Sequence, residues 1–282
     1  MASIRSGRLR ILSISVAIVA LLVICALLVE DHFADRYANR QRPRLYYEAF
    51  EHDLLTGHHG TFVVAHNAGD SVIAARDAMS HGADIIEIDV IPYAGGLYAG
   101  HSEPKGRFAE RWFRGSTVRD VLNAATDAEA IQFDLKSSAD WYLDEVAALL
   151  NDEAYADKIF LVSSRNPATL EVLAERAPHA LRALSIGETY ELVVLLADEK
   201  LANMLDGVTI RETLLDAGLV EWLREQRLFI NAWVVNDVRR ANDLIALGVG
   251  AVTTDNLALM QAIGQPHQRD YDLAGMMRPG IE

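Results

Sequence analysis

The residues best suited to chemistry are two carboxylates, Glu87 and Asp89, in a run rich in Ile and Val over residues 84–90. The run is typical of a buried strand, and since side chains alternate across a strand, both carboxylates project to the same face. At that separation they can share one cation. Burying two acids is costly unless a metal ion or hydrogen-bond donors compensate their charge. This run is therefore the first candidate site.

Polar residues also follow other apolar runs of the sequence. They are His66, His101, Asp134, Lys136, Ser163, Arg165, Asn231 and Trp233. Taken alone, each has a structural interpretation, such as a core histidine for His66 or core packing for Trp233. Coincidence is harder to accept for the group, because the acids and histidines fall at strand ends or in the loop directly after a strand.

Such a group suits cleavage of a phosphoester. Three carboxylates, Glu87, Asp89 and Asp134, favour a hard cation such as Mg²⁺ or Ca²⁺. The two histidines suit a general base and a general acid, because imidazole titrates near neutral pH. Lys136 shares a strand face with Asp134 and can hold a phosphate oxygen. A Zn²⁺ hydrolase site is the competing interpretation, but zinc prefers more neutral nitrogen ligands.

The elements that must position these residues alternate regularly from Thr61 onward. Short apolar runs predict strands at residues 62–65, 85–90, 131–135, 159–162, 181–186, 207–210, 229–235 and 251–253. Helices are predicted between them, including residues 71–81, 117–125 and 141–150, and one that begins at Pro167, where proline is tolerated.

Eight such βα units over residues 61–264 predict an α/β fold, a (β/α)8 TIM barrel. The polar residues at the strand ends then meet at one mouth, where the active sites of such barrels lie. A doubly wound open sheet is the alternative. It is less favoured in a nucleotide-binding form, because no glycine-rich phosphate loop follows the first strand.

The N-terminal part predicts a membrane anchor. Residues 1–10 are basic, residues 11–29 carry no charge, and such an apolar stretch at helical rise spans roughly 28 Å, close to the hydrocarbon thickness of a bilayer. We expect an uncleaved, single-pass transmembrane helix with the catalytic part on the extracytoplasmic side. Residues 30–60 then form a juxtamembrane linker, and residues 265–282 a loose tail.

Composition restricts the partners. The net charge of −14 disfavours nucleic acid, whose phosphates an acidic surface repels. Cys25 is the single cysteine, so no intrachain disulfide can form.

An ordered set of short motifs spans the region after the apolar N-terminal run. It comprises Ala65-His66, Glu87-Ile88-Asp89-Val90, His101, Phe133-Asp134-Leu135-Lys136, Ala232-Trp233-Val234-Val235-Asn236 and Gly248-Val249-Gly250-Ala251-Val252-Thr253-Thr254-Asp255. This set resembles the glycerophosphodiester phosphodiesterase superfamily, a (β/α)8 barrel family that also includes sphingomyelinase D-like phospholipases.

The resemblance implies roles for the polar residues. In that superfamily, a substrate hydroxyl attacks the phosphorus and a cyclic phosphate can form before release. The implied ligands of a divalent metal ion are Glu87, Asp89 and Asp134. The implied acid/base pair is His66 and His101. The implied substrate-binding residues are Lys136, Asn67, Arg165 and Trp233.

Two departures from the superfamily pattern keep alternatives open. Asn67 stands where a phosphate-binding arginine is usual and offers only a neutral hydrogen bond. Asp134 in place of glutamate is closer to the sphingomyelinase D branch, but that branch carries disulfide-bonded loops. The leading hypothesis is a membrane-anchored, metal-dependent phosphodiester hydrolase acting on glycerophosphodiesters or phospholipid headgroups. The alternatives are a phospholipase D-like lyase that gives a cyclic phosphate, and a non-catalytic barrel that binds a phosphorylated ligand.

Overall fold

The computed structural model describes residues 16–30, 32, 43–50 and 60–264. The expected basic N-terminus, part of the expected linker and the expected tail lie outside the described residues. The chain divides into two compact units, residues 1–41 with 104–114 and residues 42–103 with 115–282. The second unit contains every strand of the described residues.

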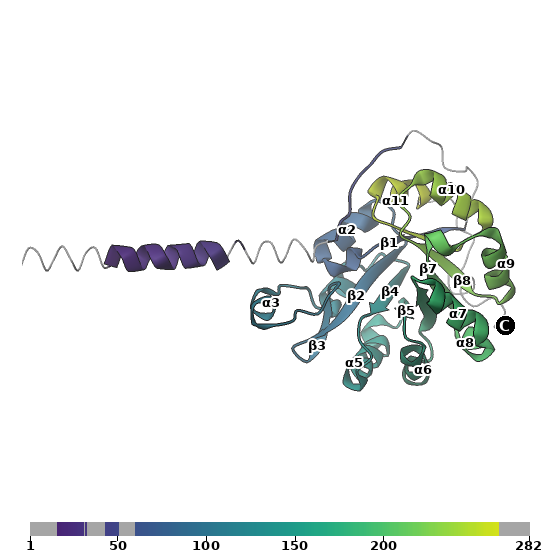
Figure 1. Ribbon diagram of the computed structural model, residues 1–282, viewed down its shortest axis with the longest axis horizontal. Coiled ribbons are helices and arrows are strands. Elements are labelled where there is room, and N and C mark those ends of the chain that lie inside the picture. Colours follow the sequence, from purple (N-terminus) through teal and green to yellow (C-terminus); the bar gives the residue numbers. More distant parts are fainter. Residues whose placement is uncertain (1–15, 31, 33–42, 51–59, 265–282) are drawn as a thin grey trace, which may run out of the picture. The chain divides into compact units, whose positions relative to one another are not determined.

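Parallel strands of the second unit close into a barrel (Figure 1). In the order of their pairing they are β1 (Phe62–Ala65), β9 (Ala251–Thr254), β8 (Phe229–Trp233), β7 (Gly207–Arg211), β6 (Leu181–Ile186), β5 (Ile159–Ser164), β4 (Ala130–Leu135) and β2 (Ile85–Tyr93). Closure follows from β1, which pairs with β9 on one side and with β2 on the other. The predicted TIM barrel is confirmed, and the open doubly wound sheet is wrong.

Helices connect the strands and lie outside them (Figure 1). They are α2 (Val72–Ser80), α4 (Val118–Ala124), α5 (Asp140–Leu150), α6 (Pro167–Arg176), α7 (Thr189–Ala197), α8 (Glu199–Met204), α9 (Ala217–Glu225), α10 (Val238–Leu247) and α11 (Leu257–Ile263), with 3₁₀ turns η1 (Ala68–Asp70), η2 (Glu153–Tyr155) and η3 (Glu212–Leu214).

Local sequence determines where these helices begin. The Thr117 side chain accepts a hydrogen bond from Asp120 N (3.1 Å), and the Asp120 carboxylate accepts one from Thr117 N (3.2 Å), a capping box that starts α4. Ser71 is the N-cap residue of α2. Pro167 occupies the first turn of α6, behind an Asn166 cap. The predicted helices therefore begin within one residue of their observed starts.

The barrel interior is apolar at one end and polar at the other. A cluster inside the amino-terminal end of the barrel contains Phe62, Val64, Leu161 and Phe229, among others. Two residues further along each strand, the inward positions turn polar, as at Glu87, which lies two residues after Ile85. The larger apolar cluster packs the outer faces of the strands against the helices. Inside the barrel, the buried polar side chains therefore lie towards the carboxyl end of the strands.

Some elements differ from the prediction. Strand β8 ends at Trp233 rather than Val235, and Val235 N donates to Thr253 O (2.8 Å) beyond the last paired residues. Strand β3 (Gly96–Ala99), which pairs antiparallel with the long end of β2, was not predicted, because its glycine-containing segment lacks an apolar run. Residues 43–48 belonged to the expected linker, but Tyr46 pairs with Asn256, next to the carboxyl end of β9.

The other unit contains α3 (Arg107–Trp112) and a helix over residues 16–30. Large apolar side chains of the second helix, such as Leu21 and Leu28, are exposed. Within the ranges that the structure describes, no helix combines the length and the hydropathy needed to cross a membrane. Residues 11–15 of the expected anchor lie outside those ranges.

Candidate active site

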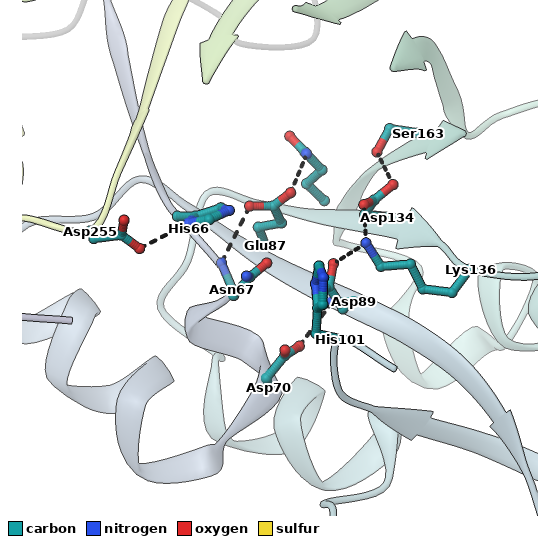
Figure 2. A network of polar contacts seen from close by, with 11 residues as sticks. His66, Asn67, Asp70, Glu87, Asp89, His101, Asp134, Lys136, Ser163 and Asp255 are labelled. Carbon is teal, nitrogen blue, oxygen red and sulfur yellow. Dashed lines mark hydrogen bonds and ion pairs between the residues drawn. The ribbon is translucent and has the colours of Figure 1, made fainter. Parts of the chain in front are cut away.

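Three carboxylates meet at the carboxyl end of β2 and β4 (Figure 2). Asp89 lies directly opposite Asp134 in the register of the two strands, and Glu87 lies one inward position deeper on β2. One oxygen of each lies within 4.8 Å of the others. Glu87 and Asp89 are almost fully buried. The predicted acids therefore share a small volume.

Cationic and neutral donors compensate the buried charge. Lys136 Nζ lies 2.7 Å from Asp89 Oδ1 and forms an ion pair with Asp134. Glu87 accepts hydrogen bonds from Gln132 Nε2 (3.1 Å) and from the backbone N of Asn67 (3.3 Å). Lys136 was predicted to hold a phosphate oxygen, and here it lies between two carboxylates.

A chain of buried polar side chains supports Glu87 from inside the barrel. Asn231 Nδ2 donates to Gln132 Oε1 (3.0 Å), and Thr253 Oγ1 donates to Asn231 Oδ1 (2.8 Å). This chain joins β9, β8 and β4 to the acid on β2. Asn231 was expected at the barrel mouth, but its inward strand position places it one layer below.

Each candidate histidine is held by a carboxylate through its Nδ1 atom (Figure 2). His66 Nδ1 lies 2.8 Å from Asp255 Oδ1, and His101 Nδ1 lies 2.8 Å from Asp89 Oδ2. Asn236 Nδ2 donates to the other oxygen of Asp255 (3.0 Å). Both pairs leave the Nε2 atom of the imidazole for a ligand.

Asp255 was not predicted as a site residue. Its signal in the sequence is its place directly after the last strand, the same place that His66 takes after β1. Pairing of β1 with β9 brings the two strand ends together, and His66 N donates to Thr254 O (3.0 Å).

The electrostatics of the pocket favour a protonated His66. Burial lowers the pKa of His66, but the hydrogen bond to Asp255 and the charge of Glu87 outweigh burial and raise this pKa to about 9. Burial raises the pKa of Glu87 to about 7, although His66 opposes the shift. Hydrogen bonds from His101 and Lys136 outweigh burial at Asp89 and lower its pKa.

A fourth acid, Asp70, lies behind the cluster. Its Oδ1 accepts a hydrogen bond from the backbone N of Asp89 (3.0 Å), and burial raises its pKa well above the ordinary value. Asp70 directly precedes Ser71, the N-cap residue of α2, and does not itself cap the helix. The Asp70 carboxyl instead ties η1 to the strand that carries two of the candidate metal ligands.

The cluster opens into a pocket of about 490 Å³. All nine predicted site residues line it, together with Ser185 and Thr209, which were not predicted. Ser185 and Thr209 occupy inward positions on β6 and β7, where they are register partners. The structure therefore brings the predicted histidines, acids and substrate-binding residues together at one mouth.

The three acids fit a hard divalent cation. Carboxylate oxygens are the ligands that Mg²⁺ and Ca²⁺ prefer, and ligands of one ion lie within a few ångströms of each other. Asp89 Oδ1 is buried, and its one close partner is Lys136 Nζ at 2.7 Å. A buried anionic oxygen with a single cationic partner can also bind a metal ion.

Comparisons with known proteins show the fold. No protein-family model and no curated protein matches this chain. Among solved structures, the chain is similar to an Oleispira antarctica phosphodiesterase in complex with the product sn-glycerol-3-phosphate, with 19% identity and a TM-score of 0.59 over 72% of this chain and 97% of that one.

Two further structures of similar fold are glycerophosphodiester phosphodiesterases. The one from Parabacteroides distasonis has 20% identity and a TM-score of 0.57, and the match covers 73% of this chain and 97% of that chain. The one from Agrobacterium tumefaciens has 19% identity and a TM-score of 0.57, with coverage of 73% and 100%. This chain therefore shares the barrel fold of these structures.

Proposed function

We propose that this protein is a metal-dependent phosphodiester hydrolase that acts on glycerophosphodiesters. The observation that carries the proposal is the meeting of three acids and two carboxylate-held histidines in one pocket. The fold likeness to glycerophosphodiester phosphodiesterases supports the substrate class. A barrel that only binds a phosphorylated ligand needs no acid/base pair.

The metal would be held by Glu87, Asp89 and Asp134. When bound, a divalent cation stabilises the negative charge that develops on phosphoryl oxygens. The positive charge of the metal ion would also offset part of the negative charge of Asp89 and Asp134 that Lys136 offsets in its absence. Lys136 Nζ is then free to donate to a phosphate oxygen, the role expected for it.

The two histidines divide the proton transfers. With its pKa raised to about 9, His66 carries a proton near neutral pH and acts as the general acid towards the leaving oxygen. His101, held by Asp89, acts as the general base on the attacking substrate hydroxyl, whose bond to phosphorus forms as the bond to the leaving alcohol breaks. Water then opens the resulting cyclic phosphate and completes the hydrolysis. Each carboxylate partner keeps the Nε2 atom of its imidazole directed to the substrate and stabilises the cationic ring.

One assay of the full chain tests the proposal. The protein is offered glycerophosphocholine, lysophosphatidylcholine and sphingomyelin with Mg²⁺, Ca²⁺ or a chelator, and the products are followed by phosphorus NMR. We expect cleavage of the glycerophosphodiester with metal only. A cyclic phosphate as final product would favour the lyase alternative, and no turnover with any metal would favour a binding protein.

Variants of the same protein test the residue roles. His66→Ala is expected to lower kcat/KM by roughly a hundredfold or more, the usual contribution of general acid–base catalysis. Glu87→Gln is expected to cause a comparable loss, because it removes the charge of one metal ligand. Glu171→Gln, an exposed acid on α6, serves as the matched control and should retain activity. Equal losses in all three variants would contradict the assignment.

We further propose that residues 11–29 anchor the protein in a membrane, with the barrel on the extracytoplasmic side. The run is uncharged, and its described part is helical with exposed apolar side chains. Anchoring would keep the barrel near substrates derived from lipids.

A further inference from the structure

Two arginines contact the same tryptophan: Arg165 and Trp233 line the pocket, and Arg211 contacts Trp233 without lining the pocket itself. The Cζ atom of Arg165, directly after β5, lies 6.0 Å from the centroid of the Trp233 ring. The Cζ atom of Arg211, the last residue of β7, lies 5.5 Å from the same centroid. Trp233 is the register partner of Arg211 at the end of β8. Both distances are within the range of cation–π interactions.

Each guanidinium group contacts one carboxylate and keeps further N–H donors. Arg165 Nη1 lies 3.5 Å from Glu191 Oε1, and Arg211 Nη2 lies 3.3 Å from Glu188 Oε1. Both contacts are longer than the roughly 2.7–2.9 Å of a charge-assisted hydrogen bond. Glu191 Oε2 already accepts from the backbone N of Gly187 and of Glu188. Most N–H donors of the two arginines therefore remain available to a ligand.

The local backbone is shaped for this arrangement. A Cβ atom on Gly187 would lie 2.7 Å from Arg165 Nη2 and 3.3 Å from Trp233 Cη2. A larger residue at this position would displace the Arg165 guanidinium from the loop that follows β6. The side chains of Arg165 and Arg211 are 53% and 40% exposed, so both are accessible from solvent.

The pocket consequently has two poles of opposite charge. The acid cluster on β2 and β4 forms one pole, where a metal would bind. Arg165, Ser185, Thr209 and Trp233 line the pocket from β5 to β8 and offer cationic and hydroxyl donors. A phosphodiester bound at the metal pole extends one of its alcohols towards the donors.

We infer that the β5–β8 side of the pocket is a subsite for an anionic group. This inference rests on the proposed function: the preferred substrate is a glycerol phosphodiester whose second alcohol carries a carboxylate or a phosphate. A quaternary ammonium headgroup is disfavoured, because it needs an open aromatic face and the Trp233 ring already holds two guanidinium groups. Cations brought to this subsite are also repelled by both arginines.

Three diesters that differ in one charge test the inference with the full chain and Mg²⁺ or Ca²⁺. In each, glycerol is joined through phosphate to a second alcohol, which is glycolate, glycerol or choline. We expect kcat/KM to be highest for the glycolate diester and lowest for the choline diester. The difference should be roughly 10- to 100-fold, the usual worth of hydrogen bonds between charged groups.

Two variants and a control locate the preference. Arg165→Gln and Arg211→Gln should each reduce the ratio of kcat/KM between the glycolate and choline diesters by roughly tenfold. The matched control is Arg224→Gln, because Arg224 lines a separate pocket with Arg227 and Phe229 and should leave the ratio unchanged. A proportional loss on all three diesters would overturn the inference, since the arginines would then serve the reacting phosphate. A wild-type preference for choline would overturn it too.

Calorimetric titration of the same diesters separates this inference from the proposed function. If no diester is cleaved with any metal, the proposed hydrolase fails. The dissociation constants still measure whether the wild-type pocket prefers the anionic arm and whether Arg165→Gln removes that preference. Equal affinities for the three diesters would contradict only the anionic subsite.

Discussion

At the scale of single residues, the main feature of the pocket is its buried negative charge. Oxygens of Glu87, Asp89 and Asp134 lie within 4.8 Å of one another, Lys136 pairs only with the two aspartates, and burial raises the pKa of Glu87 to about 7. Carboxylates in such a setting gain from any cation that binds between them. Metal binding and folding stability are therefore coupled in this protein.

The first prediction concerns that coupling. Mg²⁺ or Ca²⁺ at a hundredfold excess over its dissociation constant should raise the free energy of unfolding of the wild type by about 2.7 kcal/mol. Glu87→Gln removes one ligand charge and should abolish most of this gain, whereas Glu171→Gln should keep it. Thermal unfolding with and without chelator measures both. An undiminished gain in Glu87→Gln would place the metal elsewhere.

The second prediction concerns His66 and Asp255, measured in chelator. The pKa of His66 is raised from 6.5 to about 9, so its pairing stabilises the fold fully below pH 6.5 and less as the pH rises through 9. The pKa of Asp255 is lowered, chiefly because the His66 hydrogen bond outweighs burial, so its share is lost as the pH falls below its ordinary range.

Asp255→Asn should accordingly cost roughly 2 kcal/mol of unfolding free energy between about pH 5 and 6.5, and much less above pH 9. Histidine NMR titration should show a lower pKa for His66 in this variant. Asp216→Asn, which alters only the cap of α9, is the control for the titration. An unchanged His66 pKa in Asp255→Asn would refute the pairing.

At the scale of elements, the turn η1 supports strand β2 by close contact. A Cβ atom on Gly69 would lie 2.2 Å from Ile88 Cγ1 and 2.7 Å from the backbone O of Glu87. The turn also carries Asp70, which binds the backbone N of Asp89. Packing of η1 on β2 therefore sets the positions of two candidate metal ligands.

The third prediction follows from this contact. Gly69→Ala should lower the free energy of unfolding by roughly 1–3 kcal/mol, because overpacking displaces β2. It should also weaken metal binding measured by calorimetry. A Cβ atom on Gly218 in α9 would make only an ordinary contact, 3.5 Å from Asp216 Oδ1, so Gly218→Ala is expected to stabilise the protein by roughly 0.4–1 kcal/mol. Gly69→Ala with wild-type stability and metal affinity would show that η1 does not position β2.

At the scale of the whole molecule, the chain joins an apolar N-terminal helix to an acidic enzyme-like barrel. The proposed anchor predicts that the full chain stays with membranes.

The fourth prediction tests that anchor. In the double variant Leu21→Arg/Leu22→Arg, each charge at the middle of the run should cost roughly 2.5–3.5 kcal/mol of membrane insertion. The wild type should remain in the membrane fraction after washing with alkaline carbonate, and the double variant should be released. Ile73→Arg, a change at an exposed position of α2, controls for added charge and should remain bound. Release of the wild type itself would exclude the anchor.

The sequence alone predicted the eight parallel strands, the starts of several helices and the three candidate metal ligands, because these depend on local patterns. Alternating apolar residues mark each inward and outward face, and a cap such as Thr117 acts on the helix that directly follows it. Polar residues at strand ends predict one mouth once the barrel is assumed.

Only the tertiary structure decided which of these residues touch. Pairing of β1 with β9 brings Asp255 to His66, although the two are far apart in the chain. Register between β7 and β8 places Arg211 beside Trp233, and register between β2 and β4 places Lys136 between two acids rather than in open solvent. Such contacts depend on closure of the barrel and on strand register, which arise from packing across the whole sheet and leave no local pattern in the sequence.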